Sequence, residues 1–188
     1  MKRCSWPGED ALMIAYHDLE WGVPVHDDRK LFEFLVLDAF QAGLSWKTIL
    51  HKRENFRAAF DGFDAARIAR YGEADRERLL SDAGIVRNRM KVDATFGNAR
   101  EFLRLKEKHG SFDAWIWQFT KGNSRRNSYS SAGEIPAKTA ESDAMSKALK
   151  GEGFKFVGST ICYAFMQAAG MVNDHESGCF RYAEVTTR

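Results

Sequence analysis

The chain has 188 residues, of which 44% are hydrophobic and 29% charged, and its formal net charge is +2. This length fits one domain with its own core, and the composition excludes disordered, collagen-like and membrane-embedded chains. Three cysteines exclude a disulfide framework. Because no signal peptide is recognisable, we expect a cytoplasmic protein. The small net charge still permits a local basic patch that binds nucleic acid.

Helical patterns bounded by glycine or capping residues dominate, and no run of alternating polar and apolar residues predicts a strand. In chain order we expect helices over residues 12–20, 29–42, 45–60 (capped by Ser45), 73–83, 87–108, 112–119, 142–150 and 156–171. The polar, serine-rich stretch 120–137 is expected to be a flexible surface connector, whose Arg125 and Arg126 either touch phosphates or are simply solvated. The sequence therefore predicts an all-α fold.

Cysteine and histidine pairs occur near both ends of the chain. Cys4 and His17 form one pair, and His175 and Cys179 form the other. Two thiolates and two imidazoles make a closed tetrahedral set for a structural zinc ion. The spacing alone is weak evidence for zinc, because it matches no standard knuckle and Cys162 is a competing thiol. The alternative is two buried cysteines and two ordinary histidines.

A carboxylate lies inside an apolar helix. Asp38 falls on the same face as Leu31, Phe34 and Leu35, so we expect it to be desolvated with a raised pKa. Such groups are enriched at functional sites. The alternative is that Asp38 caps the turn that follows its helix.

Four aromatic residues cluster in the first quarter of the chain: Trp6, Tyr16, Trp21 and Trp46. With a carboxylate nearby, such residues can form a pocket for a planar cationic ring, of which a flipped nucleobase is an example. The alternative is that the tryptophans belong to the core.

A glycine turn precedes a basic helix start in the stretch 82–91. Gly84 lies in the turn, and Arg87, Arg89 and Lys91 add positive charge where backbone N–H groups would point at an anion. This pattern is similar to the hairpin of a helix-hairpin-helix DNA-binding element. We expect the backbone of residues 83–86 to donate to phosphates; the alternative is an ordinary corner between two helices.

Several motifs spread over nearly the whole chain occur in a recognisable order: CSW at 4–6, YHDLEWG at 16–22, QAGLSW at 41–46, FKFVG at 154–158, ICY at 161–163 and NDH at 173–175. Together they resemble the DNA-3-methyladenine glycosylase I family. The resemblance implies an all-α helix-hairpin-helix glycosylase fold and a single domain over residues 1–188, in which two helical lobes would flank the base pocket. It also implies a bacterial cytoplasmic setting.

The resemblance further implies hydrolysis of the N-glycosidic bond of 3-methyladenine in damaged double-stranded DNA, without a lyase step. It also implies a structural zinc ion held by Cys4, His17, His175 and Cys179. In the base pocket that it implies, Trp46 stacks on the base and Tyr16 lines the wall. Trp6 and Trp21 help to enclose the base.

Two pocket positions depart from the family pattern. Asp38 replaces a glutamate and is expected to be the catalytic and base-recognising carboxylate, with about 1.5 Å less reach. Met13 replaces a tyrosine of the base-binding pocket. Because both changes touch base recognition, altered base specificity or non-catalytic lesion binding stay open as alternatives.

Overall fold

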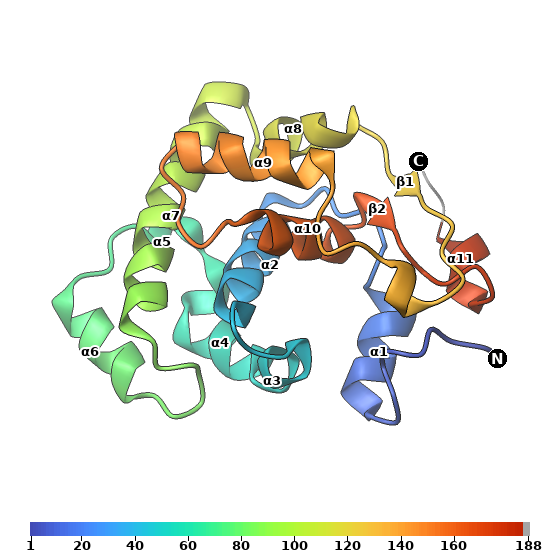
Figure 1. Ribbon diagram of the computed structural model, residues 1–188. Coiled ribbons are helices and arrows are strands. Elements are labelled where there is room, and N and C mark those ends of the chain that lie inside the picture. Colours follow the sequence, from blue (N-terminus) through green and yellow to red (C-terminus); the bar gives the residue numbers. More distant parts are fainter. Residues whose placement is uncertain (186–188) are drawn as a thin grey trace.

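The computed structural model describes residues 1–185, most of which are helical (Figure 1). Its α-helices are α1 (Ala11–Leu19), α2 (Asp28–Gln41), α3 (Trp46–His51), α4 (Arg53–Ala59), α5 (Ala65–Ile68), α6 (Glu73–Ser81), α7 (Arg89–His109), α8 (Phe112–Ile116), α9 (Ala140–Gly151), α10 (Ser159–Ala168) and α11 (Phe180–Glu184). Its shorter elements are the 3₁₀ turns η1 (Asp61–Phe63), η2 (Trp117–Thr120) and η3 (Ala132–Glu134), and the strands β1 (Arg125–Arg126) and β2 (Val172–Asn173). The predicted all-helical character is confirmed, apart from the two short strands.

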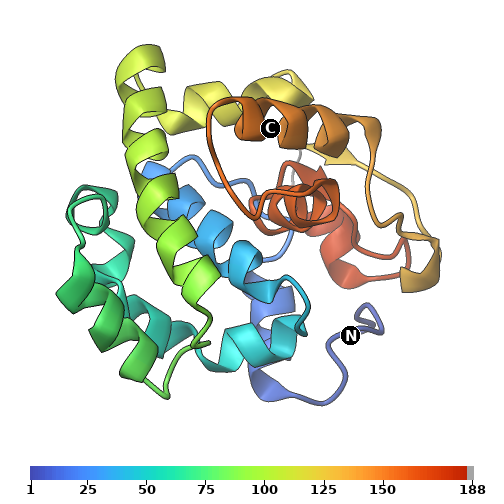
Figure 2. The same cartoon turned by 60° about the vertical axis from the view of Figure 1, so that its left-hand side comes forward.

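Helix α2 forms the centre of the molecule. It starts at the N-cap Asp27, whose carboxylate accepts from the backbone N–H of Lys30 at 2.8 Å, and every residue from 31 to 40 is buried. Figure 2 shows α2 between α7 and α10, both of which contact it. A helix that is covered on all sides buries the polar residues it carries, and here those residues are Glu33 and Asp38.

The two ends of the chain come together. The backbone N–H of Phe180 donates to Lys2 O at 3.0 Å, and both the N–H and the hydroxyl of Ser5 donate to Glu176 at 2.9 Å. Figure 1 shows α1 and α11, which lie near the two ends of the chain, on the same side of the molecule. Residues distant in sequence are thus positioned to form one cluster.

Two expected helices differ from the observed ones. The helix expected over 45–60 begins after the Ser45 cap but divides at Lys52 into α3 and α4. The helix expected over 156–171 begins only at Ser159, because Phe156 adopts a left-handed φ of 58° that no α-helix contains. The helix expected over 112–119 is present as α8 followed directly by the 3₁₀ turn η2, and the other expected helices are present with ends shifted by a few residues.

The stretch 120–137 is not a free connector. Its strand β1 pairs in parallel with β2, and Tyr129 forms a further bridge with Glu176. Arg125 forms an ion pair with Glu141, and Arg126 donates to Val185 O at 3.2 Å, so both guanidinium groups have protein partners. The absence of periodicity in this stretch reflects irregular backbone that is held by neighbouring segments.

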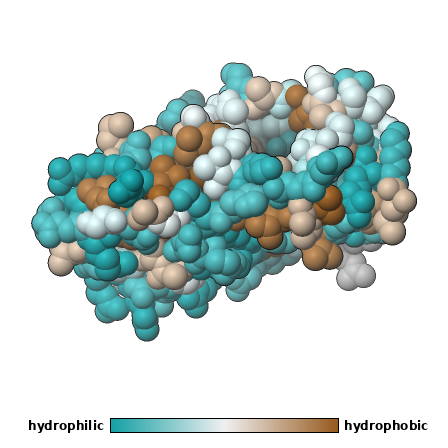
Figure 3. Space-filling view, turned by 90° about the horizontal axis from the view of Figure 1, so that it is seen from below, coloured by the Kyte–Doolittle hydropathy of each residue, from teal (hydrophilic) through white to brown (hydrophobic). Residues whose placement is uncertain are grey.

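The surface is mostly polar. From below, hydrophobic residues form separate small patches on a hydrophilic face (Figure 3). The exposed large hydrophobic residues within 1–185 are Met1, Leu12, Leu19, Leu44 and Met90. None of the helices in the described part of the chain has the length and apolar character needed to cross a membrane.

Candidate functional site

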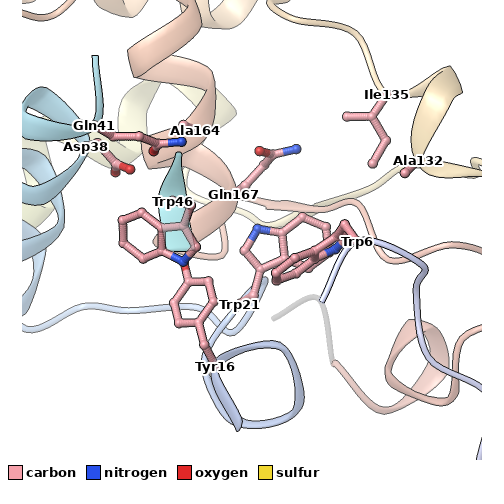
Figure 4. Close-up of a pocket in the computed structure, with 10 residues that line it drawn as sticks. All are labelled: Trp6, Tyr16, Trp21, Asp38, Gln41, Trp46, Ala132, Ile135, Ala164 and Gln167. Atoms are coloured by element: carbon pink, nitrogen blue, oxygen red, sulfur yellow. The ribbon is translucent and has the colours of Figure 1, made fainter. Parts of the chain in front are cut away.

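An open cavity of about 300 Å³ lies where α1, α2, α3, η3 and α10 meet. Its lining comprises Trp6, Tyr16, Trp21, Asp38, Gln41, Trp46, Ala132, Ile135, Ala164 and Gln167 (Figure 4). The cavity therefore brings together all the pocket residues expected from the sequence except Met13, namely Trp6, Tyr16, Trp21, Asp38 and Trp46.

Aromatic rings form much of the cavity wall. The ring centroids of Tyr16 and Trp46 are 5.0 Å apart, and those of Trp6 and Trp21 are also 5.0 Å apart with planes at 69°. The indole Nε1 atoms of Trp6 and Trp46 are buried and have no hydrogen-bond partner within residues 1–185. The wall thus offers flat apolar surfaces, which suit a planar heterocycle.

Asp38 is the acidic group of the cavity. It is 2% exposed, and its Oδ2 has no hydrogen-bond partner among the described residues. Burial raises its pKa well above the ordinary value. No backbone N–H of residues 41–43 donates to it, so the alternative role as a cap for that turn is wrong. An unpartnered carboxyl in an aromatic cavity is costly for folding and is available to a ligand.

A partly buried ionic network lies at the end of α1, the helix that carries Tyr16. Arg53 on α4 donates to Glu20 at 2.8 and 2.7 Å and to Glu33 on α2 at 2.7 Å. This network ties α1 to α2, and hence Tyr16 to Asp38. Burial, reinforced by the nearby Asp38, raises the pKa of Tyr16 well above its usual range, so the phenol keeps its proton.

Sequence reasoning missed half of the cavity lining: Gln41, Ala132, Ile135, Ala164 and Gln167. Ala164 and Gln167 share one face of α10 at a spacing of three residues, a signal that was readable. Ala132 and Ile135 belong to the stretch expected to be a connector. Met13 was expected in the base pocket, but it is buried and lines a neighbouring cavity together with Trp6 and Lys47.

Cys4, His17, His175 and Cys179 form a buried cluster that joins the two ends of the chain. His17 Nε2 and His175 Nδ1 are 3.2 Å apart, and each sulfur lies 3.5 Å from one of these nitrogens. A tetrahedral zinc site with bonds of about 2.0–2.3 Å has ligand–ligand edges of about 3.3–3.8 Å. The donor set and its spacing therefore fit a metal ion.

Neighbouring groups orient these donors. His17 Nδ1 lies 2.7 Å from Asp18 Oδ1, and His175 Nε2 donates to Trp21 O at 3.0 Å, which leaves the other ring nitrogen of each histidine facing the cluster. Burial lowers the pKa of His175 to about 4 and raises that of Cys4 to about 12. The imidazoles are thus neutral, and a bound cation would compensate the cost of buried thiolates.

The hairpin between α6 and α7 packs on α3 and α4 through its carbonyl groups. Lys52 donates to Ala83 O at 3.0 Å and to Gly84 O at 3.2 Å. A Cβ on Gly84 would lie 2.9 Å from Asp82 Oδ1 and 3.1 Å from Asn55 Cβ, so this close packing requires glycine. Sequence reasoning did not anticipate Lys52 as the anchor of the hairpin.

The amide groups of the hairpin are only partly free. The N–H of Gly84 donates to Asp82 Oδ1 at 2.7 Å, whereas those of Ala83 and Val86 have no acceptor within residues 1–185. Two of the four expected N–H donors are thus uncommitted.

The charges near the hairpin divide into two kinds. Arg87 and Arg89 are exposed at the start of α7. Lys91 is 6% exposed, and its Nζ donates to Phe40 O at 2.8 Å and Ala42 O at 2.6 Å. The expectation that Lys91 contacts phosphate is wrong, because its ammonium group points inward and caps α2.

Comparison with known proteins gives a consistent assignment. The family model described as methyladenine glycosylase matches residues 6–182. DNA-3-methyladenine glycosylase 1 of Escherichia coli is 52% identical over 182 residues, which is 97% of each chain. A crystal structure of 3-methyladenine DNA glycosylase I superposes with a TM-score of 0.93 at 54% identity, covering 95% of this chain and 98% of that one.

A variant of 3-methyladenine DNA glycosylase I solved in complex with 3-methyladenine is similar at 33% identity, with a TM-score of 0.92 over 96% of this chain and 97% of that one. The span of the family model, residues 6–182, contains the cavity lining, the hairpin and three of the four cluster residues, His17, His175 and Cys179. The chain therefore belongs to the methyladenine glycosylase family.

Proposed function

We propose that this protein is a DNA-3-methyladenine glycosylase I, which hydrolyses the N-glycosidic bond of an alkylated base, with 3-methyladenine as its substrate, in base-excision repair. The observation that carries this proposal is the buried, unpartnered carboxyl of Asp38 in an aromatic cavity, in a chain with 52% identity to a named glycosylase of this kind. Since segments from both ends of the chain line the cavity, we propose that residues 1–188 act as one catalytic domain.

The cavity chemistry suits a flipped, methylated purine. Stacking on Trp46, with Tyr16, Trp6 and Trp21 completing the wall, would stabilise such a base by about 1–3 kcal/mol per stacked ring. A 3-methylated adenine in DNA is a cation, and its charge favours the ionised form of Asp38, whose own burial opposes ionisation. Base and carboxylate thus neutralise each other inside the cavity.

The positive charge also determines how much catalysis is needed. When the C1′–N9 bond breaks, its electron pair returns to the base, which leaves as neutral 3-methyladenine. Water then adds at C1′ and gives up one proton, which leaves an abasic site with a hydroxyl at C1′. No strong acid is required for such a leaving group. We assign two roles to the Asp38 carboxylate: it holds the base, and it stabilises the positive charge that develops on the sugar.

We assign zinc to the end-joining cluster. Two thiolates and two imidazoles at tetrahedral spacing are the donors of a structural zinc site. Because four protein ligands leave no coordination position for water, the ion would stabilise the fold and take no part in hydrolysis.

We propose that the hairpin contacts the backbone of damaged double-stranded DNA. The free N–H groups of Ala83 and Val86 and the exposed side chains of Arg87 and Arg89 would bind phosphates, with Gly84 allowing the close packing of the turn. We place the protein in the bacterial cytoplasm, where its DNA substrate lies.

The test is base release from duplex DNA methylated with dimethyl sulfate, with unmethylated DNA as the control. Free 3-methyladenine should appear, together with abasic sites in unbroken strands. Trp46→Ala should slow release at least about tenfold, because it removes a stacking surface. Phe119→Ala, which truncates a half-buried aromatic residue outside the cavity, should not. A well-folded native protein that releases no alkylated base would overturn the proposal.

A further inference from the structure

Gln167 is the cavity residue whose side-chain amide is held by another protein group. It lies on α10, and its Nε2 donates to Asp174 Oδ2 at 2.8 Å. Figure 4 shows its amide pointing into the space between Asp38 and Ile135, with the oxygen on the side of Asp38. Within residues 1–185 that oxygen accepts no hydrogen bond, and it is not sealed from the cavity.

Asp174 dictates which way this amide faces. It is 1% exposed and accepts three hydrogen bonds: from Gln167, from the Tyr163 hydroxyl at 2.6 Å and from Asn127 Nδ2 at 2.6 Å. Burial, together with this hydrogen bond, raises the pKa of Tyr163, so its phenol stays a donor. A carboxylate surrounded by donors only accepts, and Gln167 must therefore turn its NH₂ group toward it.

The remaining oxygen of Gln167 faces the cavity as an acceptor. A flipped amide would place the two oxygens of Gln167 and Asp174 against each other and leave a buried carboxylate short of one donor, which costs about 1–3 kcal/mol. The other cavity amide, Gln41, has no side-chain hydrogen bond among the described residues and can present either end. Only Gln167 carries a fixed polarity.

We propose that Gln167, held by Asp174, selects bases with an exocyclic amino group. This inference rests on the proposed function and adds a specificity residue to it. A 3-methyladenine joined to DNA has one N–H-bearing group, its exocyclic amine, and that group has two hydrogens. The cavity offers it two acceptors, Asp38 and the fixed oxygen of Gln167. A base with a carbonyl oxygen at the same ring atom would meet the fixed oxygen of Gln167, which is repulsive and leaves that acceptor unpaired.

Free-base binding tests this independently of DNA contact and of catalysis. The probes are 3-methyladenine and 3-methylhypoxanthine, in which an oxygen replaces the amine. Quenching of the cavity tryptophans reports the Kd of each. The native protein should prefer 3-methyladenine, and Gln167→Met, of similar length but without an acceptor oxygen, should reduce the ratio of the two Kd values about tenfold.

The positioning role of Asp174 has its own signature. In Asp174→Asn the new amide can donate to the Gln167 oxygen and turn the Gln167 NH₂ group toward the cavity, so the preference should fall and shift toward 3-methylhypoxanthine. A merely structural defect would weaken both bases equally. If Asp174→Asn does not fold, Tyr163→Phe removes another donor from the same oxygen and should lower the ratio by a smaller amount. Unchanged ratios in the folded Asp174 or Tyr163 variant would overturn the positioning role.

The matched control is Gln41→Leu, which removes the amide that no protein group orients. It can weaken both bases, but their ratio should stay at the native value. A native-like ratio in Gln167→Met overturns the inference while base release by the native protein keeps the proposed function intact. A native protein that binds neither base and releases none fails at the proposed function instead.

Discussion

Lys91 Nζ donates to the carbonyl oxygen of Phe40 at 2.8 Å, which joins the first turn of α7 to the last turn of α2. The same ammonium donates to Ala42 O at 2.6 Å. Helix α7 begins directly after the hairpin proposed to bind DNA, and the last turn of α2 carries Asp38. One buried side chain therefore connects the DNA-contacting segment with the helix that presents the carboxyl.

Replacing Lys91 with Met should destabilise the protein by about 1–3 kcal/mol, because two helix-end carbonyls lose their donor. Urea unfolding measures this loss, and 3-methyladenine release should slow with it. Lys91→Arg retains a cation and should recover part of both. A phosphate-contacting lysine would do the opposite: Lys91→Met would keep native stability and reduce the salt dependence of DNA binding.

Lys91 also illustrates the limit of prediction from sequence. Charge and position placed it beside Arg87 and Arg89, but which face of α7 meets α2 is a tertiary fact. Helix existence, the Ser45 cap and the burial of Asp38 followed from local pattern. The break at Lys52 did not, because it accompanies contact with a hairpin 31 residues away in sequence.

Half of the cavity lining could be predicted from sequence, because only some of its residues have a recognisable local pattern. Aromatic residues and a carboxylate in one stretch of sequence have recognisable chemistry, whereas Ala132 and Ile135 have none of their own. Gln167 and Asp174 become informative only when their hydrogen bond is seen. Family resemblance supplied the end-joining cluster, which spacing alone left open.

Removal of a cluster donor should abolish metal binding. Purified protein is expected to contain one zinc ion, and Cys179→Ala should contain none and unfold at a markedly lower temperature, since metal binding contributes folding free energy. Metal analysis and thermal unfolding provide the readouts. Cys162→Ala is the control, because that thiol is buried beside Val157 O and lies outside the cluster. Equal zinc content in Cys179→Ala would contradict the assignment.

Charge reversal at the hairpin should weaken DNA binding without base preference. Each of Arg87→Glu and Arg89→Glu should reduce the slope of log affinity against log salt by about one counterion. Lys108→Glu makes the same charge change at the far end of α7, where Lys108 faces Glu152, and should keep the native slope. DNA affinity measured at several salt concentrations gives the slope for each variant. Identical slopes in all variants would mean that the DNA binds elsewhere on the protein.

The burial of Asp38 predicts a pH-dependent cost in stability. Its raised pKa means that the folded protein keeps a proton that the unfolded chain releases near pH 3.9, so stability falls as pH rises above about 4 until the folded carboxyl ionises. Asp38→Asn cannot ionise and should gain melting temperature relative to the native protein as pH increases. Thermal unfolding from acidic to alkaline pH measures the difference, in which the shared metal cluster cancels. A difference that is constant with pH would contradict a raised pKa.

The most direct test of the central claim is single-turnover release of 3-methyladenine from methylated duplex DNA by the native protein, Asp38→Asn and Asp38→Glu. If the carboxylate in the aromatic cavity drives excision, Asp38→Asn should be slower by about 100-fold or more, whereas Asp38→Glu should retain release, because it keeps the charge. Native-rate release by Asp38→Asn would contradict the account.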